Sequence, residues 1–260
     1  MPTSRTDLPA ADLSSYSEAC VRFARDAWPL RAAEELRSAL IFRGLTRASR
    51  ALAIPEPWPS RFAAAVRDEL GHARLCAIVG ARLGARAPAY DARRVRARLA
   101  TLTSPRRTVM SILLAELAIG ETISMFLFRA SRRAARERLT RAALSAILAD
   151  EARHQRLGWN ALTALWPSLT ETERDDLQHE AARALASCEQ GTAVPAMHWL
   201  RSGRRFESEY AALGVVDPAI RVETFYAAVE RFVVPRLSRL GLDGARAWAS
   251  RYAVPRLARP

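Results

Sequence analysis

Two short segments of the sequence place an acidic pair ahead of a histidine. They are DELGH at 68–72 and DEARH at 150–154, and the 260-residue chain has only 4 histidines in all. On an α-helix, a Glu and a His three residues apart are separated by about 60° around the axis and about 4.5 Å along it. One metal ion can bind both side chains. The repeated spacing therefore predicts that Glu69, His72, Glu151 and His154 are metal ligands.

The motifs need helices to position them, and helical patterns dominate the sequence, with no segment that alternates like a β-strand. Pro29 is typical of a first helical turn, Ser60 of an N-cap, and Thr170 with Glu173 of a capping box. Four helices joined by a short, a long and a short link have the connectivity of two hairpins with one long crossover. We expect these four helices at 30–52, 60–83, 106–129 and 139–165, and further helices at 170–188, 217–233 and 243–252, with an irregular stretch at 191–205.

This pattern predicts an all-α protein with two parts. Residues 1–166 are expected to form a four-helix bundle with an N-terminal extension, and 167–260 a C-terminal helical extension packed on it.

The first and third helices should each add one carboxylate to the site. Glu34 or Glu35 is the candidate on the first, and Glu116 or Glu121 on the third. Four carboxylates would balance two divalent ions, whereas four buried carboxylates without metal would repel one another strongly. Carboxylate oxygens with one imidazole per ion favour iron or manganese over zinc or calcium.

The segments ELRSALIF, DELGHARL, GETIS and DEARHQRLGW together resemble the ferritin-like di-iron carboxylate superfamily over residues 17–166. The resemblance implies a ferritin-like bundle, and it implies that Asp68 bonds His154 while Asp150 bonds His72, fixing each imidazole for metal binding. It also implies two iron ions, bridged by Glu69 and Glu151, with the full ligand set Glu35, Glu69, His72, Glu121, Glu151 and His154.

A site of this kind would belong to a di-iron oxidoreductase that activates dioxygen or peroxide, with Glu35, Glu69, Glu121 and Glu151 as its catalytic carboxylates. The reaction would be hydroxylation, desaturation or N-oxygenation of a small organic or carrier-protein-bound substrate, with an external electron donor. We expect the substrate near Ser38, Phe42, Ser124 and Phe128. Two alternatives stay open: a ferroxidase or peroxidase of the ferritin–rubrerythrin type, and a tRNA-modifying hydroxylase.

Charge is a weaker indicator of function. The chain has 40 basic and 27 acidic residues, a formal net charge of +13, and every basic residue is Arg. Abundant Ala without Lys is typical of a G+C-rich genome, which raises Arg content independently of function. Arginines cluster at 93–98 and 106–107 and again at 129–141, where they could dock an acidic carrier protein or RNA. Few aromatic residues accompany them, which disfavours nucleic acid as a partner.

The remaining features are typical of a cytoplasmic protein, alone or as a homodimer. The 3 cysteines are far apart, and the N-terminus lacks the apolar stretch of a secretory signal. The apolar segment 111–128 contains Glu116 and Glu121, so we expect a buried helix and no membrane span. Cys76 and the tryptophans are expected to pack in the core or at its rim, and His179 and His198 to be ordinary side chains.

Overall fold

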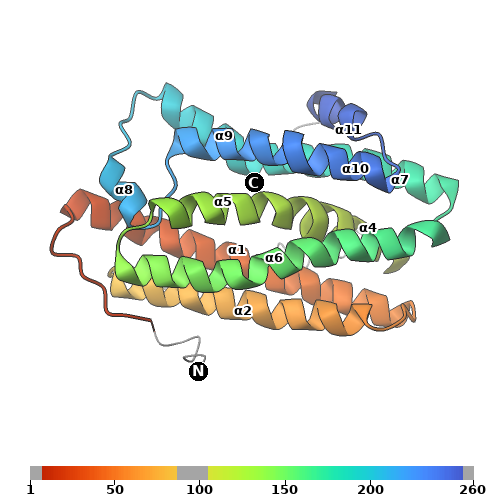
Figure 1. Ribbon diagram of the computed structural model, residues 1–260, viewed down its shortest axis with the longest axis horizontal. Helices are drawn as coiled ribbons and strands as arrows, with labels where there is room; N and C mark the ends of the chain where they lie inside the picture. Colours follow the sequence, from red (N-terminus) through yellow and green to blue (C-terminus); the bar gives the residue numbers. More distant parts are fainter. Residues whose placement is uncertain (1–7, 87–104, 254–260) are drawn as a thin grey trace. The chain divides into compact units, whose positions relative to one another are not determined.

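The computed structural model describes residues 8–86 and 105–253 (Figure 1). Within those ranges every regular element is a helix, which confirms the predicted all-α class. The elements are α1 (Glu18–Ala51), α2 (Trp58–Arg82), α4 (Pro105–Ile112), the π-helix η1 (Leu113–Gly120), α5 (Glu121–Ala134), α6 (Arg138–Leu165), the 3-10 turn η2 (Trp166–Ser168), α7 (Glu171–Arg201), α8 (Ser208–Ala212), α9 (Pro218–Ala228), the π-helix η3 (Val229–Val233), α10 (Val234–Leu240), α11 (Gly244–Ser250) and the 3-10 turn η4 (Arg251–Ala253).

Helix α1 begins well before the predicted start near residue 30. The side chain of Ser17 caps it by accepting from the backbone N–H of Cys20 at 3.2 Å. Pro29 therefore lies inside the helix and not in its first turn, which corrects the sequence prediction. A helix-interior Pro costs about 3 kcal/mol. The long buried face of α1, from Cys20 to Ser49, provides packing that offsets this cost.

A short connection returns the chain into α2, and the two helices lie side by side (Figure 1). Gly80 of α2 lies next to Pro29 of α1, because a Cβ at Gly80 would be in ordinary van der Waals contact with the Pro29 ring at 3.5 Å. Helix α2 starts at Trp58 with Pro57 at its N-cap, so the predicted cap at Ser60 is wrong. Pro59 lies in the first turn of α2, where a backbone N–H would have no partner within the helix. The helix can therefore begin before Pro59 without losing a hydrogen bond.

The described chain divides into two compact units that interleave along the sequence. Unit 1 takes the residues up to Val109, then Leu127–Arg153 and Arg205–Asp217. Unit 2 takes Met110–Phe126, His154–Arg204 and the residues from Pro218 onward. Both α5 and α6 contribute residues to each unit. The predicted division after residue 166 stays a prediction.

Described residues of α1, α2, α5 and α6 form an apolar core in unit 1. Trp28 is a fully buried member of it, and its indole N–H donates to the Leu213 carbonyl at 3.0 Å. That bond satisfies the one polar atom of a large apolar side chain. The other fully buried members include Cys20, Ala24, Cys76, Val79, Leu139, Leu144 and Ile147, so Cys76 is a core residue as predicted.

Unit 2 is built on η1 and α7, with α9 and α11 also packed on α7. The predicted capping box is confirmed: Thr170 accepts from the Glu173 N–H, and Glu173 accepts from the Thr170 N–H. Helix α7 then continues through Pro195 to Arg201, so the predicted irregular stretch at 191–205 is wrong over most of its length. Helices α9 and α10 are joined directly by η3 and extend past the predicted end near residue 233.

The helical run Pro105–Ala134 is the one described helix long and apolar enough to cross a membrane. Its most apolar window is 61% buried inside the protein, as in the core helix of a soluble protein. The burial of this helix agrees with the prediction that the apolar segment 111–128 forms a buried helix. The cytoplasmic location stays a prediction.

Candidate metal centre

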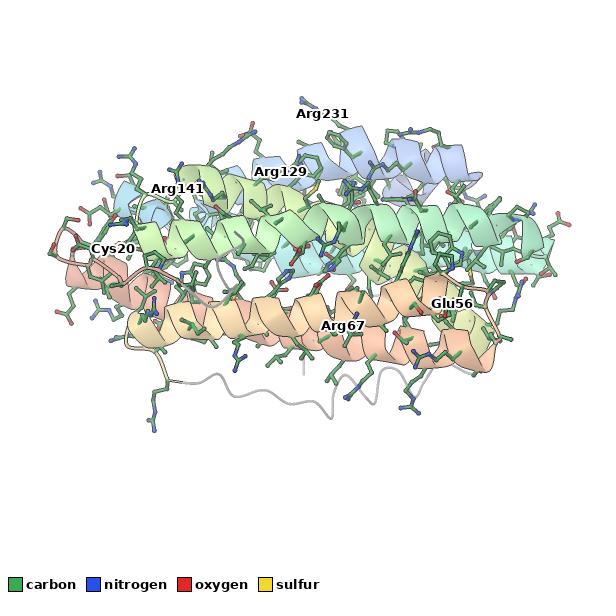
Figure 2. All side chains as sticks on the ribbon, turned by 60° about the horizontal axis from the view of Figure 1, so that its bottom comes forward. Cys20, Glu56, Arg67, Arg129, Arg141 and Arg231 are labelled. Atoms are coloured by element: carbon green, nitrogen blue, oxygen red, sulfur yellow. The ribbon has the colours of Figure 1, made fainter. Side chains whose placement is uncertain are left out.

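Two residues of the first motif occupy the buried stripe of α2. Glu69 and His72 are each 1% exposed and lie in line with Phe62, Ala65 and Cys76 on the inner face. Arg67, labelled in Figure 2, lies on the exposed face of the same helix. A period near 3.6 residues places a Glu and a His at i and i+3 on one side of the helix, so both are buried together.

Helices α1 and α6 each bring one carboxylate to this pair. Glu35 of α1 is 6% exposed and Glu151 of α6 is 1% exposed. Ligand atoms from Glu35, Glu69, His72 and Glu151 all lie within 4.8 Å of one another. Of the two acids considered on the first helix, Glu35 joins this group and Glu34 is exposed to solvent.

The imidazole of His72 is held at both nitrogens. Its Nδ1 lies 3.2 Å from Glu151 Oε1, 3.6 Å from Glu35 Oε2 and 4.0 Å from Glu69 Oε2. Its Nε2 lies 3.3 Å from Asp150 Oδ2, so the expected Asp150–His72 pair is present. When Nε2 donates to Asp150, the Nδ1 lone pair of a neutral imidazole faces the three glutamates. A metal ligand needs this tautomer.

Arg153 also contributes to this site, and it was not predicted from the sequence. Its Nη2 donates to Asp68 Oδ2 at 3.0 Å and lies 2.7 Å from Asp150 Oδ1, so one guanidinium joins the leading acids of both motifs. The side chain is 52% exposed and covers the buried Asp150 from outside. The sequence signal was present, because Arg153 lies within the second motif, directly before His154.

The electrostatics of the group are dominated by negative charge. Burial lowers the pKa of His72, but hydrogen bonds to Asp150, Glu151 and Glu35 raise it more strongly, to about 12. Without metal, His72 is therefore protonated and partly neutralises its acidic neighbours. Burial, with the negative charge of Glu35 nearby, also raises the pKa of the Cys76 thiol well above its usual range, so Cys76 stays a neutral core side chain.

The donor set fits a hard or borderline divalent cation. Three carboxylates and one imidazole nitrogen converge in a place with almost no solvent contact. Buried carboxylates of like charge are costly unless a cation compensates them. Oxygen-rich ligation with a single imidazole suits iron or manganese, while structural zinc sites in proteins rely on Cys and His. The described structure therefore contains a buried carboxylate–histidine cluster able to hold a metal ion.

The two other predicted ligands, Glu121 and His154, belong to unit 2. Glu121 is the first residue of α5 and is 6% exposed, while Glu116, the alternative, is only half-buried. His154 lies on α6 one helical turn after Glu151 and is 2% exposed. Both side chains are thus buried, as ligands must be. Their role as ligands, and the bond expected between Asp68 and His154, stay predictions.

The other sequence-predicted residues have varied positions. Phe42 and Phe128 are buried, and Ser38 and Ser124 are half-buried, so the expected substrate position near them stays a prediction. His179 and His198 are exposed, as expected for ordinary side chains. The arginines at 93–98 lie outside the described residues, whereas Arg129 and Arg141 are exposed (Figure 2).

Comparison of the chain with protein-family models, with curated proteins and with solved structures finds no match. The buried cluster around His72 is therefore the basis for assigning a function.

Proposed function

We propose that this protein is a non-haem di-iron oxidoreductase that activates dioxygen or peroxide to oxidise a small organic or carrier-bound substrate. The observation that carries the proposal is the convergence of Glu35, Glu69 and Glu151 on the Nδ1 side of His72, all buried. When bound, the metal pair supplies the redox chemistry that no side chain in the cluster can provide.

Asp150 positions the imidazole for this role. Because it accepts from Nε2 of His72, it favours the tautomer that presents Nδ1 to the carboxylates. Arg153 holds Asp150 in turn and links it to Asp68 on α2. Burial of the glutamates keeps water from competing with them for a cation and strengthens each electrostatic contact.

Glu121 and His154 would provide a second carboxylate–imidazole pair for the di-iron centre. Support comes from the sequence, where the two motifs have the same spacing, and from the burial of both side chains. The four carboxylates Glu35, Glu69, Glu121 and Glu151 would then balance the charge of two divalent ions. Manganese in place of iron would satisfy the same donor set.

Anaerobic titration of the metal-free protein with Fe(II) tests the proposal. We expect two irons per chain, a new ultraviolet absorption on exposure to dioxygen, and oxygen consumption that needs an electron donor and an organic substrate. Substitution His72→Ala should abolish tight iron binding, whereas His179→Ala, at an exposed histidine, should leave it intact.

Two results would contradict the proposal. Fewer than two irons per chain would remove the di-iron assignment. Continuous turnover of Fe(II) or peroxide without any organic substrate would instead identify a ferroxidase or peroxidase.

A further inference from the structure

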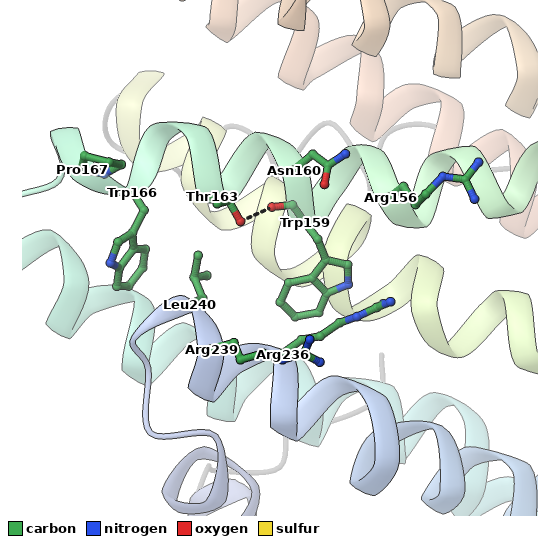
Figure 3. A pocket seen from close by; sticks show the side chains of 9 residues that line it. All are labelled: Arg156, Trp159, Asn160, Thr163, Trp166, Pro167, Arg236, Arg239 and Leu240. Atoms are coloured by element: carbon green, nitrogen blue, oxygen red, sulfur yellow. Dashed lines mark hydrogen bonds between the residues drawn. The ribbon is translucent and has the colours of Figure 1, made fainter.

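Unit 2 contains a pocket that is separate from the residues of the metal centre. It has a volume of about 340 Å³ and is formed by the last turns of α6, by η2 and by α10. Figure 3 shows Trp166 and Pro167 at one end and Arg156 at the other, with Trp159 and Arg236 between them. Leu240 lies between the two indoles, and Arg239 lies beside Arg236. The size is at the lower end of the range for small-molecule sites.

Three of the nine residues that line the pocket are arginines. Within the part of the chain that the structure describes, Arg156, Arg236 and Arg239 form no ion pair. Burial lowers the pKa of Arg236, and repulsion from the guanidinium group of Arg239 lowers it further. An anion placed among them would relieve that repulsion and accept charge-assisted hydrogen bonds.

The aromatic side of the pocket is fixed in place. The indole N–H of Trp159 donates to Thr122 Oγ1 at 3.0 Å, and that hydroxyl donates to the Ala118 carbonyl. Trp166 lies directly against Gly241, since a Cβ there would come within 3.2 Å of the indole ring. Gly241 has a φ of 103°, a left-handed conformation that disfavours other residues. Rigid rings of this kind bind flat apolar groups at little entropic cost.

We propose that this pocket binds a small phosphomonoester that carries a flat ring, such as a nucleoside monophosphate. The phosphate would lie among the three arginines, because a dianion matches their charge better than a single carboxylate does. The ring would lie toward Trp166 and Leu240, at the apolar end. The inference does not depend on the metal centre, since none of the proposed metal ligands lines the pocket.

Calorimetric titration of the full-length protein tests the inference, with adenosine monophosphate, inorganic phosphate and adenosine as separate probes. The monophosphate should bind more tightly than either fragment, and its Kd should rise with salt concentration. Substitution Arg236→Gln or Arg239→Gln should raise the Kd for the monophosphate about tenfold, as expected for loss of one charge-assisted contact. Trp166→Leu should weaken binding of the monophosphate and leave that of inorganic phosphate unchanged.

Arg231→Gln is the matched control, because it removes the same charge from an exposed position just before α10 (Figure 2). It should leave the Kd unchanged. Equal weakening by Arg231→Gln would show binding through overall charge alone and would overturn the proposal. So would an absence of binding by the correctly folded wild-type protein, or binding of inorganic phosphate as tight as that of the monophosphate. Arg239 is exposed, so Arg239→Gln keeps the test valid if Arg236→Gln fails to fold.

Discussion

Glu34 and Glu35 are adjacent in sequence and differ sharply in environment, which makes them a matched pair for testing the metal centre. Glu35 provides one of four ligand atoms that lie within 4.8 Å of one another, while Glu34 is exposed. The substitutions Glu35→Gln and Glu34→Gln each remove one negative charge without changing size. Only the first should weaken metal binding.

The expected magnitude follows from the geometry. At about 4 Å and an effective dielectric of 20, one pair of unit charges contributes about 4 kcal/mol, and a divalent ion interacts more strongly. Part of this is recovered, because the amide oxygen still faces the ion and the metal-free cluster loses some repulsion. We therefore expect Glu35→Gln to raise the metal Kd about a hundredfold, equivalent to about 2.7 kcal/mol.

Urea unfolding with and without metal measures this difference. With free Mn(II) or anaerobic Fe(II) at one hundred times the wild-type Kd of the ion that Glu35 binds, that one ion should stabilise the wild type and Glu34→Gln by about 2.7 kcal/mol. For Glu35→Gln the same concentration should give only about 0.4 kcal/mol. Equal stabilisation of the two variants by metal would refute the assignment of Glu35 as a ligand.

Three further predictions concern unit 2. Gly158→Ala should lower the free energy of unfolding by about 3 kcal/mol or more in chemical denaturation, because the new Cβ would lie 2.4 Å from the Leu117 backbone. Gly191→Ala is the matched control: its Cβ would have no atom within 4 Å, so it should raise the free energy of unfolding by about 1 kcal/mol. Glu189→Gln should cost about 3 kcal/mol, because Glu189 is the buried partner of Arg251 at 3.2 Å; a loss below 1 kcal/mol would show that the pair contributes little. Burial and the hydrogen bond to Glu189 raise the pKa of Tyr226 from 10.0 to about 12, so stability from this group should be present below pH 10 and lost as the pH rises through 12. Ultraviolet titration of the wild type against Tyr226→Phe measures that pKa, which Glu189→Gln should lower.

The helical class and the shared face of Glu69 and His72 could be predicted because both depend on local periodicity. A Glu and a His at i and i+3 within an amphipathic segment must share a face, whatever the rest of the chain does. The structure brings Glu69 and His72 together with Glu151 and Glu35, and periodicity alone had left Glu34 and Glu35 as equal candidates on the first helix. Arg153 was not predicted, because its role depends on the distance between α2 and α6, which no spacing within one helix specifies.

The helix boundaries were less predictable, and proline shows why. The local rule ends or starts helices at Pro, yet Pro29 and Pro195 lie inside α1 and α7. At Pro29, burial of one face of α1 along its length offsets the cost of the proline, whose ring lies close to Gly80 of α2. Such compensation is tertiary and leaves no mark in the local sequence.

The π-helix Leu113–Gly120 could not be predicted from the sequence either, because its residues are ordinary helix formers. Its hydrogen bonds span five residues, as between the Glu121 N–H and the Glu116 carbonyl. In an α-helix, Leu114 and Leu117 would lie on the same face as Glu121. That periodicity does not apply within the π-helix, although both leucines are buried.

The π-helix also marks where the length of this helical run can change. Each hydrogen bond of the π type in Leu113–Gly120 spans one residue more than an α-helical bond, so deleting one residue there would let the segment relax to α-helical bonding. The segments on either side would then face nearly as before, and Val109 and Ile112, now 1% and 3% exposed, would stay buried. The same deletion within Glu121–Ala134, where the bonding is α-helical, would instead turn one side of the helix by about 100° relative to the other. Within this run, the π-helix is therefore the place where losing one residue disturbs the buried faces least.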